Sequence, residues 1–246
     1  HGELVPVKKN MHYFNHTFEL PDYYAVKVIA NGERLSCVGV HVVTNGWCPI
    51  VNDKLYQNIT LSNDSGYMHI PKKQLTTVLP NNDSIVQVGY KNIRDFGLIA
   101  DNMTFETRFM NNAALGGTGC YDSKVEIINT HGRLSFNFVM PGCDEKILQA
   151  EFGAVYLAVE FNNLNTFFQD ISYWRVVKIV TKKKRVAVYL DDVKIYSVRY
   201  NNVLYDVNVI SFRFKGSGAV DYVKLFNENN ELIYHDDFSR KLAQNN

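Results

Sequence analysis

Long apolar runs are missing from the sequence. The longest stretches are of the size of Ala154 to Val159, far short of the roughly 18 residues that a membrane-spanning helix needs. An excess of one charge is also missing, because 26 Lys and Arg residues face 25 Asp and Glu residues, for a net charge of +1. Such a balance gives no long-range field toward nucleic acid or an anionic membrane. We therefore expect neither nucleic acid as a partner nor insertion of this chain into a membrane.

Motifs for catalysis and targeting are scarce as well. Serine-nucleophile motifs, glycine-rich phosphate loops and Cys-x-x-Cys pairs do not occur, so the common routes to acyl transfer, phosphoryl transfer and redox chemistry lack their residues. The first residues, His1 to Leu4, lack the basic and apolar regions of a signal peptide. A leader or an anchor could lie outside this sequence or have been removed.

Tyrosine and phenylalanine are abundant, with 15 of each against 2 Trp, and both residue types favour strands. From Tyr24 onward, apolar and polar residues alternate over short segments that end at Gly, Asn or Asp, which is the period of a strand. No segment has the pattern of a long amphipathic helix. The sequence therefore predicts an all-β sandwich. The predicted strands are 24–29, 35–43, 55–61, 67–70, 85–90, 103–109, 154–161, 174–180 and 209–214, with hairpins at 120–143, 185–199 and 220–234.

The clearest local pattern is the hairpin at 120–143. A two-residue turn centred on 131–132 would place Val125 opposite Phe138 and Ile127 opposite Phe136. These pairs make one apolar face, and we expect the other face to be polar and half solvated.

Four cysteines are compatible with two disulfides. The hairpin register places Cys120 opposite Cys143, and directly opposed strand residues are close enough to bridge, so we predict this disulfide. Cys37 and Cys48 could form a second disulfide or remain thiols.

A second hairpin is expected around the turn 191–192. In that register Val188 meets Ile195 and Leu190 meets Val193. Asp at both central positions tolerates the left-handed conformation less well than Asp-Gly would.

Four segments resemble strand motifs of the concanavalin A-like, laminin G-like jelly rolls. They are 96–106, with its Ala-Asp-Asn-Met-Thr-Phe-Glu run, the double strand 174–179 and 186–195, and the closing strand 218–226. The matches follow the family's order, although Asp192 stands where the family usually has Gly. The resemblance implies a jelly-roll sandwich and an exported protein.

The earlier part of the chain is similar to a different family. Segments 26–43, 65–71 and 88–91 resemble a carboxypeptidase regulatory-like, transthyretin-like β-sandwich. On this basis we expect a small β-sandwich at 1–93 followed by the jelly roll at 94–246. No Pro, Gly or Ser-rich linker separates the halves, so the first part could instead add strands to one large sandwich. Such pairs of modules are common in bacterial surface proteins that handle glycans, which implies a periplasmic or cell-surface location.

The acidic residues do not match the hydrolytic members of the concanavalin A-like superfamily. Those enzymes carry paired carboxylates that alternate along one strand. The nearest candidates here, Asp144, Glu145 and Glu151, lack the alternation and are better explained as a solvated loop. We therefore expect no catalytic residues and a sandwich face without paired carboxylates.

Metal-ligand patterns are weak. His12 and His16 have a spacing that would need a helix, but their segment reads as extended, so we predict no metal site there. The pairs 191–192 and 236–237, both Asp-Asp, could bind Ca²⁺, although Asp is also typical of tight turns. We expect no other cofactor. The basic run 182–185 could contact a heparin-like glycan, but a solvated turn explains it better.

The two tryptophans could be platforms on which sugars stack. Trp174 occupies a position that packs inside the sandwich in laminin G-like domains, so Trp47 is the more exposed candidate. We predict an extracytoplasmic, non-catalytic module that binds glycan or protein. The alternatives are a glycan-active hydrolase with an atypical carboxylate pair, and the ectodomain of a membrane-anchored sensor or scaffold protein. Fold analogy supports all three, and it supports them only by association.

Overall fold

The structure is a computed structural model that describes residues 22–30, 33–42, 46–51, 54–55, 66–70, 87–112, 122–129, 132–139, 146–152, 155–160, 171–201, 203–215 and 217–238. By contacts the chain divides into two compact units after Val42. The first unit contains an antiparallel hairpin of β1 (Asp22–Ala30) and β2 (Glu33–Val42). No helix in the described part of the chain is long and apolar enough to cross a membrane.

The second unit contains two antiparallel sheets. The eight-stranded sheet has the order β11-β10-β9-β8-β15-β6-β3-β4. Its strands are β3 (Trp47–Val51), β4 (Lys54–Leu55), β6 (Gln87–Ile93), β8 (Asp122–Asn129), β9 (Gly132–Val139), β10 (Lys146–Phe152), β11 (Val155–Glu160) and β15 (Val209–Lys215).

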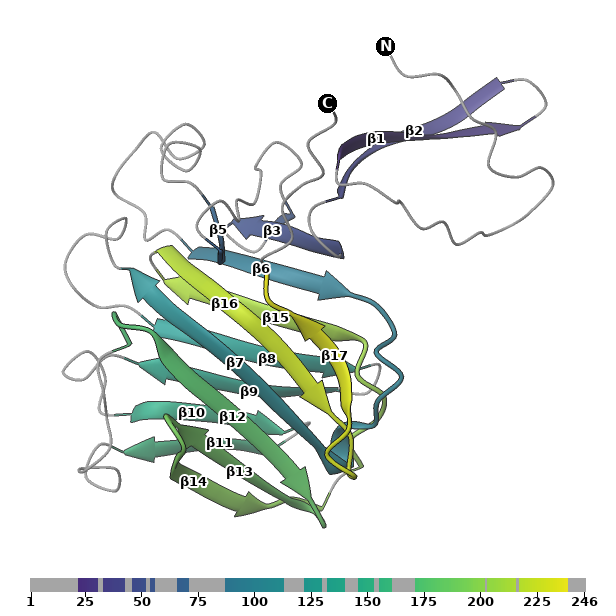
Figure 1. The fold of residues 1–246 in the computed structure, drawn as a ribbon. Coiled ribbons are helices and arrows are strands. Elements are labelled where there is room, and N and C mark those ends of the chain that lie inside the picture. Colours follow the sequence, from purple (N-terminus) through teal and green to yellow (C-terminus); the bar gives the residue numbers. More distant parts are fainter. Residues whose placement is uncertain are drawn as a thin grey trace. The chain divides into compact units, whose positions relative to one another are not determined.

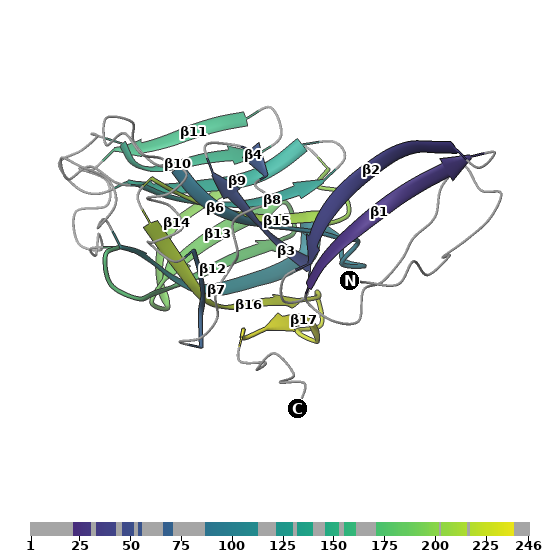
Figure 2. The same cartoon turned by 90° about the horizontal axis from the view of Figure 1, so that it is seen from above.

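The seven-stranded sheet has the order β14-β13-β12-β7-β16-β17, with β5 paired to β16. Its strands are β5 (Met68–His69), β7 (Met103–Asn112), β12 (Arg175–Lys182), β13 (Arg185–Leu190), β14 (Val193–Arg199), β16 (Ser217–Phe226) and β17 (Leu232–Asp236). A helical turn, η2 (Ala100–Asn102), leads into β7. Figures 1 and 2 show the two sheets stacked face to face. The prediction of an all-β sandwich is confirmed.

The core forms where the inward faces of the two sheets meet. Phe105 and Phe109 of β7 lie on the same face, as predicted, and both are fully buried. Their rings approach Phe212 and Phe214 of β15 in the other sheet, with ring centres 6.4 and 6.1 Å apart. Alternation along each strand leaves the intervening residues on the outer faces, and these faces carry the candidate sites.

The β8–β9 hairpin has the predicted faces but a different register. Val125 pairs with Phe136, and Asn129 pairs with Gly132, so the register is shifted by two residues from the predicted one. The shift moves the turn toward the N-terminus. A shift of two leaves the same residues on each face, and the apolar face is buried as predicted. The register that opposed Cys120 to Cys143 is therefore not formed, and both cysteines lie outside the described residues.

The β13–β14 hairpin turns at Asp191 and Asp192, as predicted. Both residues have positive φ angles, 48° and 65°, so aspartate does adopt the left-handed conformation that this turn requires. Leu190 pairs with Val193 as expected. Val188, however, meets Tyr196 instead of Ile195, because a bulge follows Val188.

The expected domain boundary at residues 93/94 does not coincide with the division of the structure. β6 precedes this position, yet it pairs along its whole length with β15. β3 pairs with β6, and β5 pairs with β16. The segment from β3 to β6 thus supplies strands to the large sandwich, which was the alternative that the missing linker left open.

Candidate functional site

Trp47 does not form a sugar platform. Its side chain is fully buried, because β3 pairs with β6 and directs the indole into the core. The indole packs against Phe212 and Phe238, with ring centres 5.8 Å away in each case. Its Nε1 donates a hydrogen bond to Asp236 Oδ2 at 3.1 Å. The prediction that Trp47 is the exposed tryptophan was wrong, and its role is structural.

The Asp-Asp turn is held by the protein's own donors. Asp191 accepts hydrogen bonds from Arg175 Nη1 at 3.0 Å and from the Val176 backbone N–H at 2.9 Å. Asp192 forms an ion pair with Lys178 at 3.0 Å. These contacts are what the turn interpretation predicts.

Metal-ligand side chains do not gather in the described part of the chain. No three His, Cys, Asp or Glu residues there lie close enough together to hold a metal ion. His12 and His16 lie outside the described residues, so the expectation for that pair remains a prediction.

Cys48 carries a free thiol in the structure. The side chain of Cys37 lies outside the described part of the structure, so a Cys37–Cys48 disulfide stays a prediction. Burial raises the pKa of this thiol, and the neighbouring Lys91 opposes the shift only in part. A thiol with a raised pKa is a poor nucleophile at neutral pH.

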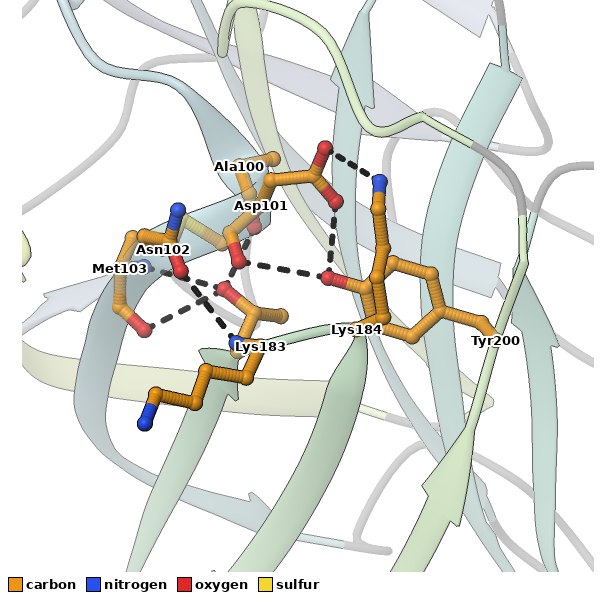
Figure 3. Close-up of polar contacts among 8 residues, drawn as sticks. Ala100, Asp101, Asn102, Met103, Lys183, Lys184 and Tyr200 are labelled. Atoms are coloured by element: carbon orange, nitrogen blue, oxygen red, sulfur yellow. Dashed lines mark hydrogen bonds and ion pairs between the residues drawn. The ribbon is translucent and has the colours of Figure 1, made fainter.

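The basic run 182–185 is divided by its turn. Lys183 and Lys184 have φ angles of 50° and 57°, and Figure 3 shows Lys184 reaching Asp101 while Lys183 points away. Lys184 Nζ lies 2.8 Å from Asp101 Oδ2, and the Tyr200 hydroxyl donates to Asp101 Oδ1 at 2.8 Å. Burial, aided by Asp101, raises the pKa of the Tyr200 phenol. This cluster holds η2, the β12–β13 turn and the end of β14 together, which is a structural role.

Glu126 lies on the outer face of the eight-stranded sheet, but its side chain is only 1% exposed. Three cations contact its carboxylate. Lys124 Nζ and Arg133 Nη1 lie 3.3 and 3.5 Å from Oε1, and Arg213 Nε donates to Oε2 at 3.0 Å. Both carboxylate oxygens are thus engaged. The expectation of a half-solvated outer face was therefore wrong for this part of the sheet.

Glu151 shares a row with Glu126. Ser135 of β9 pairs with Glu126 on one side and with Glu151 of β10 on the other. Two strand spacings separate the Cα atoms of the glutamates by roughly 9.6 Å. The expectation that Glu151 lies in a solvated loop was wrong. Asp144 and Glu145 lie outside the described residues.

An aromatic and polar cluster lies at one end of the seven-stranded sheet, and we call Tyr67, His69, Arg108, Trp174 and Asp221 the aromatic shelf. Trp174 is partly exposed. The Arg108 guanidinium carbon lies 5.2 Å from the centre of its ring, a distance typical of a cation–π contact. The ring of Tyr67 meets the indole edge to face, with ring centres 5.2 Å apart.

Two polar features complete the aromatic shelf. Arg108 Nη1 lies 2.9 Å from Asp221 Oδ2, and Asp221 is the extra residue of a bulge in β16. The ring of His69 lies 5.1 Å from that of Tyr67. Its Nδ1 is buried, and it has no hydrogen-bond partner within the described structure. The shelf therefore offers a partly exposed ring and a fixed ion pair, while the His69 Nδ1 lies buried beneath the surface.

Next to the aromatic shelf, charges alternate across three strands. Glu106 of β7 lies between Lys178 of β12, at 3.4 Å, and Lys224 of β16, at 3.5 Å. The Tyr222 hydroxyl donates to Glu106 at 3.1 Å, and burial together with Glu106 raises the pKa of this phenol. Each charge in this strip has a partner of opposite sign.

Sequence reasoning missed most of the aromatic shelf. Its residues come from four separate segments, 67–69, 108, 174 and 221, and no motif links them. Only strand pairing brings them together, because β16 pairs with β5 on one side and with β7 on the other.

No protein-family model and no curated protein matches the sequence. Among solved structures, the chain is similar to the carbohydrate binding module CBM66 from Bacillus subtilis, with 11% identity and a TM-score of 0.46, over 74% of this chain and 95% of that one. It is also similar to the Emp47p carbohydrate recognition domain, with 14% identity and a TM-score of 0.47, over 76% and 90% of the two chains. A third likeness, to a native glycosidic hydrolase, has 11% identity and a TM-score of 0.45, over 86% and 98%. At these values the likenesses define no family and carry no argument about function.

Proposed function

We propose that this chain is a non-catalytic module that binds glycan through the aromatic shelf. The observation that carries the proposal is the position of Trp174, which is partly exposed and held between Arg108 and Tyr67. A ring held in this way loses little conformational freedom on binding. Its apolar face can cover the C–H face of a sugar.

The polar groups of the shelf suit sugar hydroxyls. A hydroxyl both donates and accepts, and the Arg108–Asp221 pair offers guanidinium donors beside carboxylate acceptors. One aromatic surface with a few convergent polar groups is the usual composition of a small-ligand site.

The test is calorimetric titration with neutral hexasaccharides of glucose, xylose, arabinose and fructose. We expect at least one to bind, and we expect Trp174→Ala to weaken that binding about tenfold or more, because stacking on an aromatic anchor is lost. Tyr189→Ala is the matched control, since Tyr189 is a half-buried aromatic of β13 in the same sheet. If none of the sugars binds, or if Trp174→Ala binds as well as the wild type, the proposal fails.

A hydrolase is the second candidate, and the row shared by Glu126 and Glu151 favours it. The Cα atoms of the two glutamates lie roughly 9.6 Å apart, a backbone spacing compatible with the roughly 6.5–9.5 Å between the carboxyl groups of inverting glycosidases. Against it, the Glu126 side chain is 1% exposed and both of its oxygens contact cations, so the carboxylate does not face a sugar or solvent. Release of reducing ends from any of the four hexasaccharides, abolished in Glu151→Gln, would establish the enzyme.

In the same proposal we place the module outside the cytoplasm, at the cell surface or in the periplasm. The resemblance of segments 96–106, 174–179, 186–195 and 218–226 to laminin G-like jelly rolls supports this location. Fractionation of the native cells tests it, and recovery of the protein with cytoplasmic markers alone would contradict it. A transmembrane segment encoded upstream of His1 would favour the anchored ectodomain.

A further inference from the structure

Three cationic residues lie side by side at one corner of the seven-stranded sheet. Lys182 of β12 pairs with Arg185 of β13, and Arg185 pairs with Arg199 of β14. Directly paired residues of antiparallel strands project on the same face, with Cβ atoms about 5 Å apart. The neighbouring Val186 is fully buried, so alternation directs Arg185 outward. All three residues are exposed, and we call them the cation row.

The cation row has no carboxylate partner among the residues that the structure describes. Within the described residues, its side chains make a hydrogen bond from Arg185 Nη1 to Ser197 Oγ at 3.3 Å. Lys184, in the adjacent turn, differs, because it is paired with Asp101. Lys182 and Arg185, at the two ends of the basic run, thus lie beside Arg199 on the outer face of the sheet without a described carboxylate.

This arrangement costs stability in the free protein. Like charges directly opposite each other destabilise a sheet, whereas an anion placed over the row would relieve the repulsion and gain charge-assisted hydrogen bonds. We propose that the cation row binds an anionic polysaccharide by contacting the carboxylate or sulfate groups of that polysaccharide. The row does not share residues with the aromatic shelf, so the inference stands whether or not the shelf binds neutral sugars.

The surroundings of the row favour a polysaccharide over nucleic acid. The next row on the same face consists of Thr104, Val180, Ala187 and Ser197, which pair across β7, β12, β13 and β14. These side chains are small, and none can stack on a base, as proteins that bind single strands require. The net charge of +1 also gives no long-range attraction for a nucleic acid. Short-range contact with a chain of repeated charges is what the row can provide.

The experiment measures binding of two charged polymers and their uncharged counterparts at low salt. Oligogalacturonate and its methyl ester test carboxylates, while dextran sulfate and dextran test sulfates. We expect one or both charged polymers to bind, and the uncharged ones not to bind. The double variant Arg185→Gln, Arg199→Gln should lose about tenfold or more of the affinity for the charged polymer, because charge-assisted contacts are lost. Lys194→Gln is the matched control, since Lys194 is an exposed lysine of β14 outside the row.

A second readout separates a binding role from a structural one. The double variant should unfold at the same or a higher temperature than the wild type, because repulsion has been removed. Lys182→Gln should repeat both effects more weakly, which guards against misfolding of the double variant. Trp174→Ala should leave polyanion binding unchanged, so this result is independent of the proposed function. Unaltered binding by the double variant, an equal loss in Lys194→Gln, or tighter binding of a single-stranded oligodeoxynucleotide would overturn the proposal.

Discussion

Each sheet carries a group of three cations on its outer face, and the two groups differ by one carboxylate. On the eight-stranded sheet, Lys124, Arg133 and Arg213 share Glu126. On the seven-stranded sheet, the described residues provide no carboxylate for the cation row. The carboxylate of the first group neutralises part of its charge, whereas the second group has no counterion within the described part of the chain. The same residue types therefore serve the fold on one sheet, and on the other they form the row that we propose binds a polyanion.

Burial explains why the two groups need different partners. The Glu126 side chain is 1% exposed, and a carboxylate removed from water is costly unless charges and donors surround it. The residues of the cation row are exposed, so water solvates each charge and the repulsion between them remains modest. A small cost of this kind is tolerable where binding requires it.

The largest expected effect comes from removing the carboxylate of the first group. Glu126→Gln should lower the free energy of unfolding by about 2 kcal/mol, because three cations then lose their common partner. The value lies below that of a fully buried pair, since the three cations are 31–46% exposed and solvent screens them. Urea denaturation measures it. Glu228→Gln, in the exposed turn before β17, is the control, and an equal loss in both variants would remove the distinction.

A smaller effect concerns Asp122, a carboxylate of β8 without such a group of cations. Burial raises its pKa more than Lys215 and Asn137 lower it. The folded state then retains the proton to a higher pH than the unfolded chain does. The protonated Asp122 therefore stabilises the folded state in acid, and this contribution is lost as the pH rises through the raised pKa.

The variant Asp122→Asn tests this sign. It should be more stable than the wild type by about 0.5 kcal/mol at pH 7, with the advantage gone at about pH 3, where an ordinary carboxyl is protonated. Denaturation at the two pH values measures it, beside the exposed Asp206→Asn as control. A variant that is less stable at pH 7 would show that the partners outweigh burial.

The smallest effect is expected at the cation row. Lys182→Gln should raise the free energy of unfolding by about 0.3 kcal/mol at low salt, and added salt should abolish the difference, because it screens the like charges. Denaturation at low and high NaCl concentrations measures it. A destabilised variant would mean that Lys182 has a structural role and that the two groups do not differ in kind.

Alternation in the sequence predicted the strands and their buried faces, because the period of two depends only on local residue order. As expected, the face of β8 that carries Val125 is buried, and so is the face of β7 that carries Phe105 and Phe109. The register between paired strands depends less on local residue order than the alternation of faces does. The β8–β9 turn lies one position earlier than the sequence suggested, and the bulge after Val188 alters one pair of the next hairpin.

The sites depended on contacts that no local pattern encodes. Trp47 is buried because β3 joins β6, which the expected boundary at 93/94 had separated from the rest of the sandwich. Glu126 is buried because cations from β8, β9 and β15 converge on it. The basic run was visible in the sequence, but the pairing of Lys184 with Asp101 and the alignment of Lys182 and Arg185 with Arg199 depend on the register of three strands.

Tryptophan fluorescence provides the most direct measurement of the central claim, that Trp174 is the sugar-binding surface. The chain has 2 Trp, of which Trp47 is fully buried and Trp174 is partly exposed. With tryptophan excited selectively, titration with the hexasaccharide that binds should change the emission of the wild type. It should leave unchanged the emission of Trp174→Phe, in which Trp47 is the remaining tryptophan. The same change in Trp174→Phe as in the wild type would contradict the account, because the sugar would then be acting elsewhere than at the shelf.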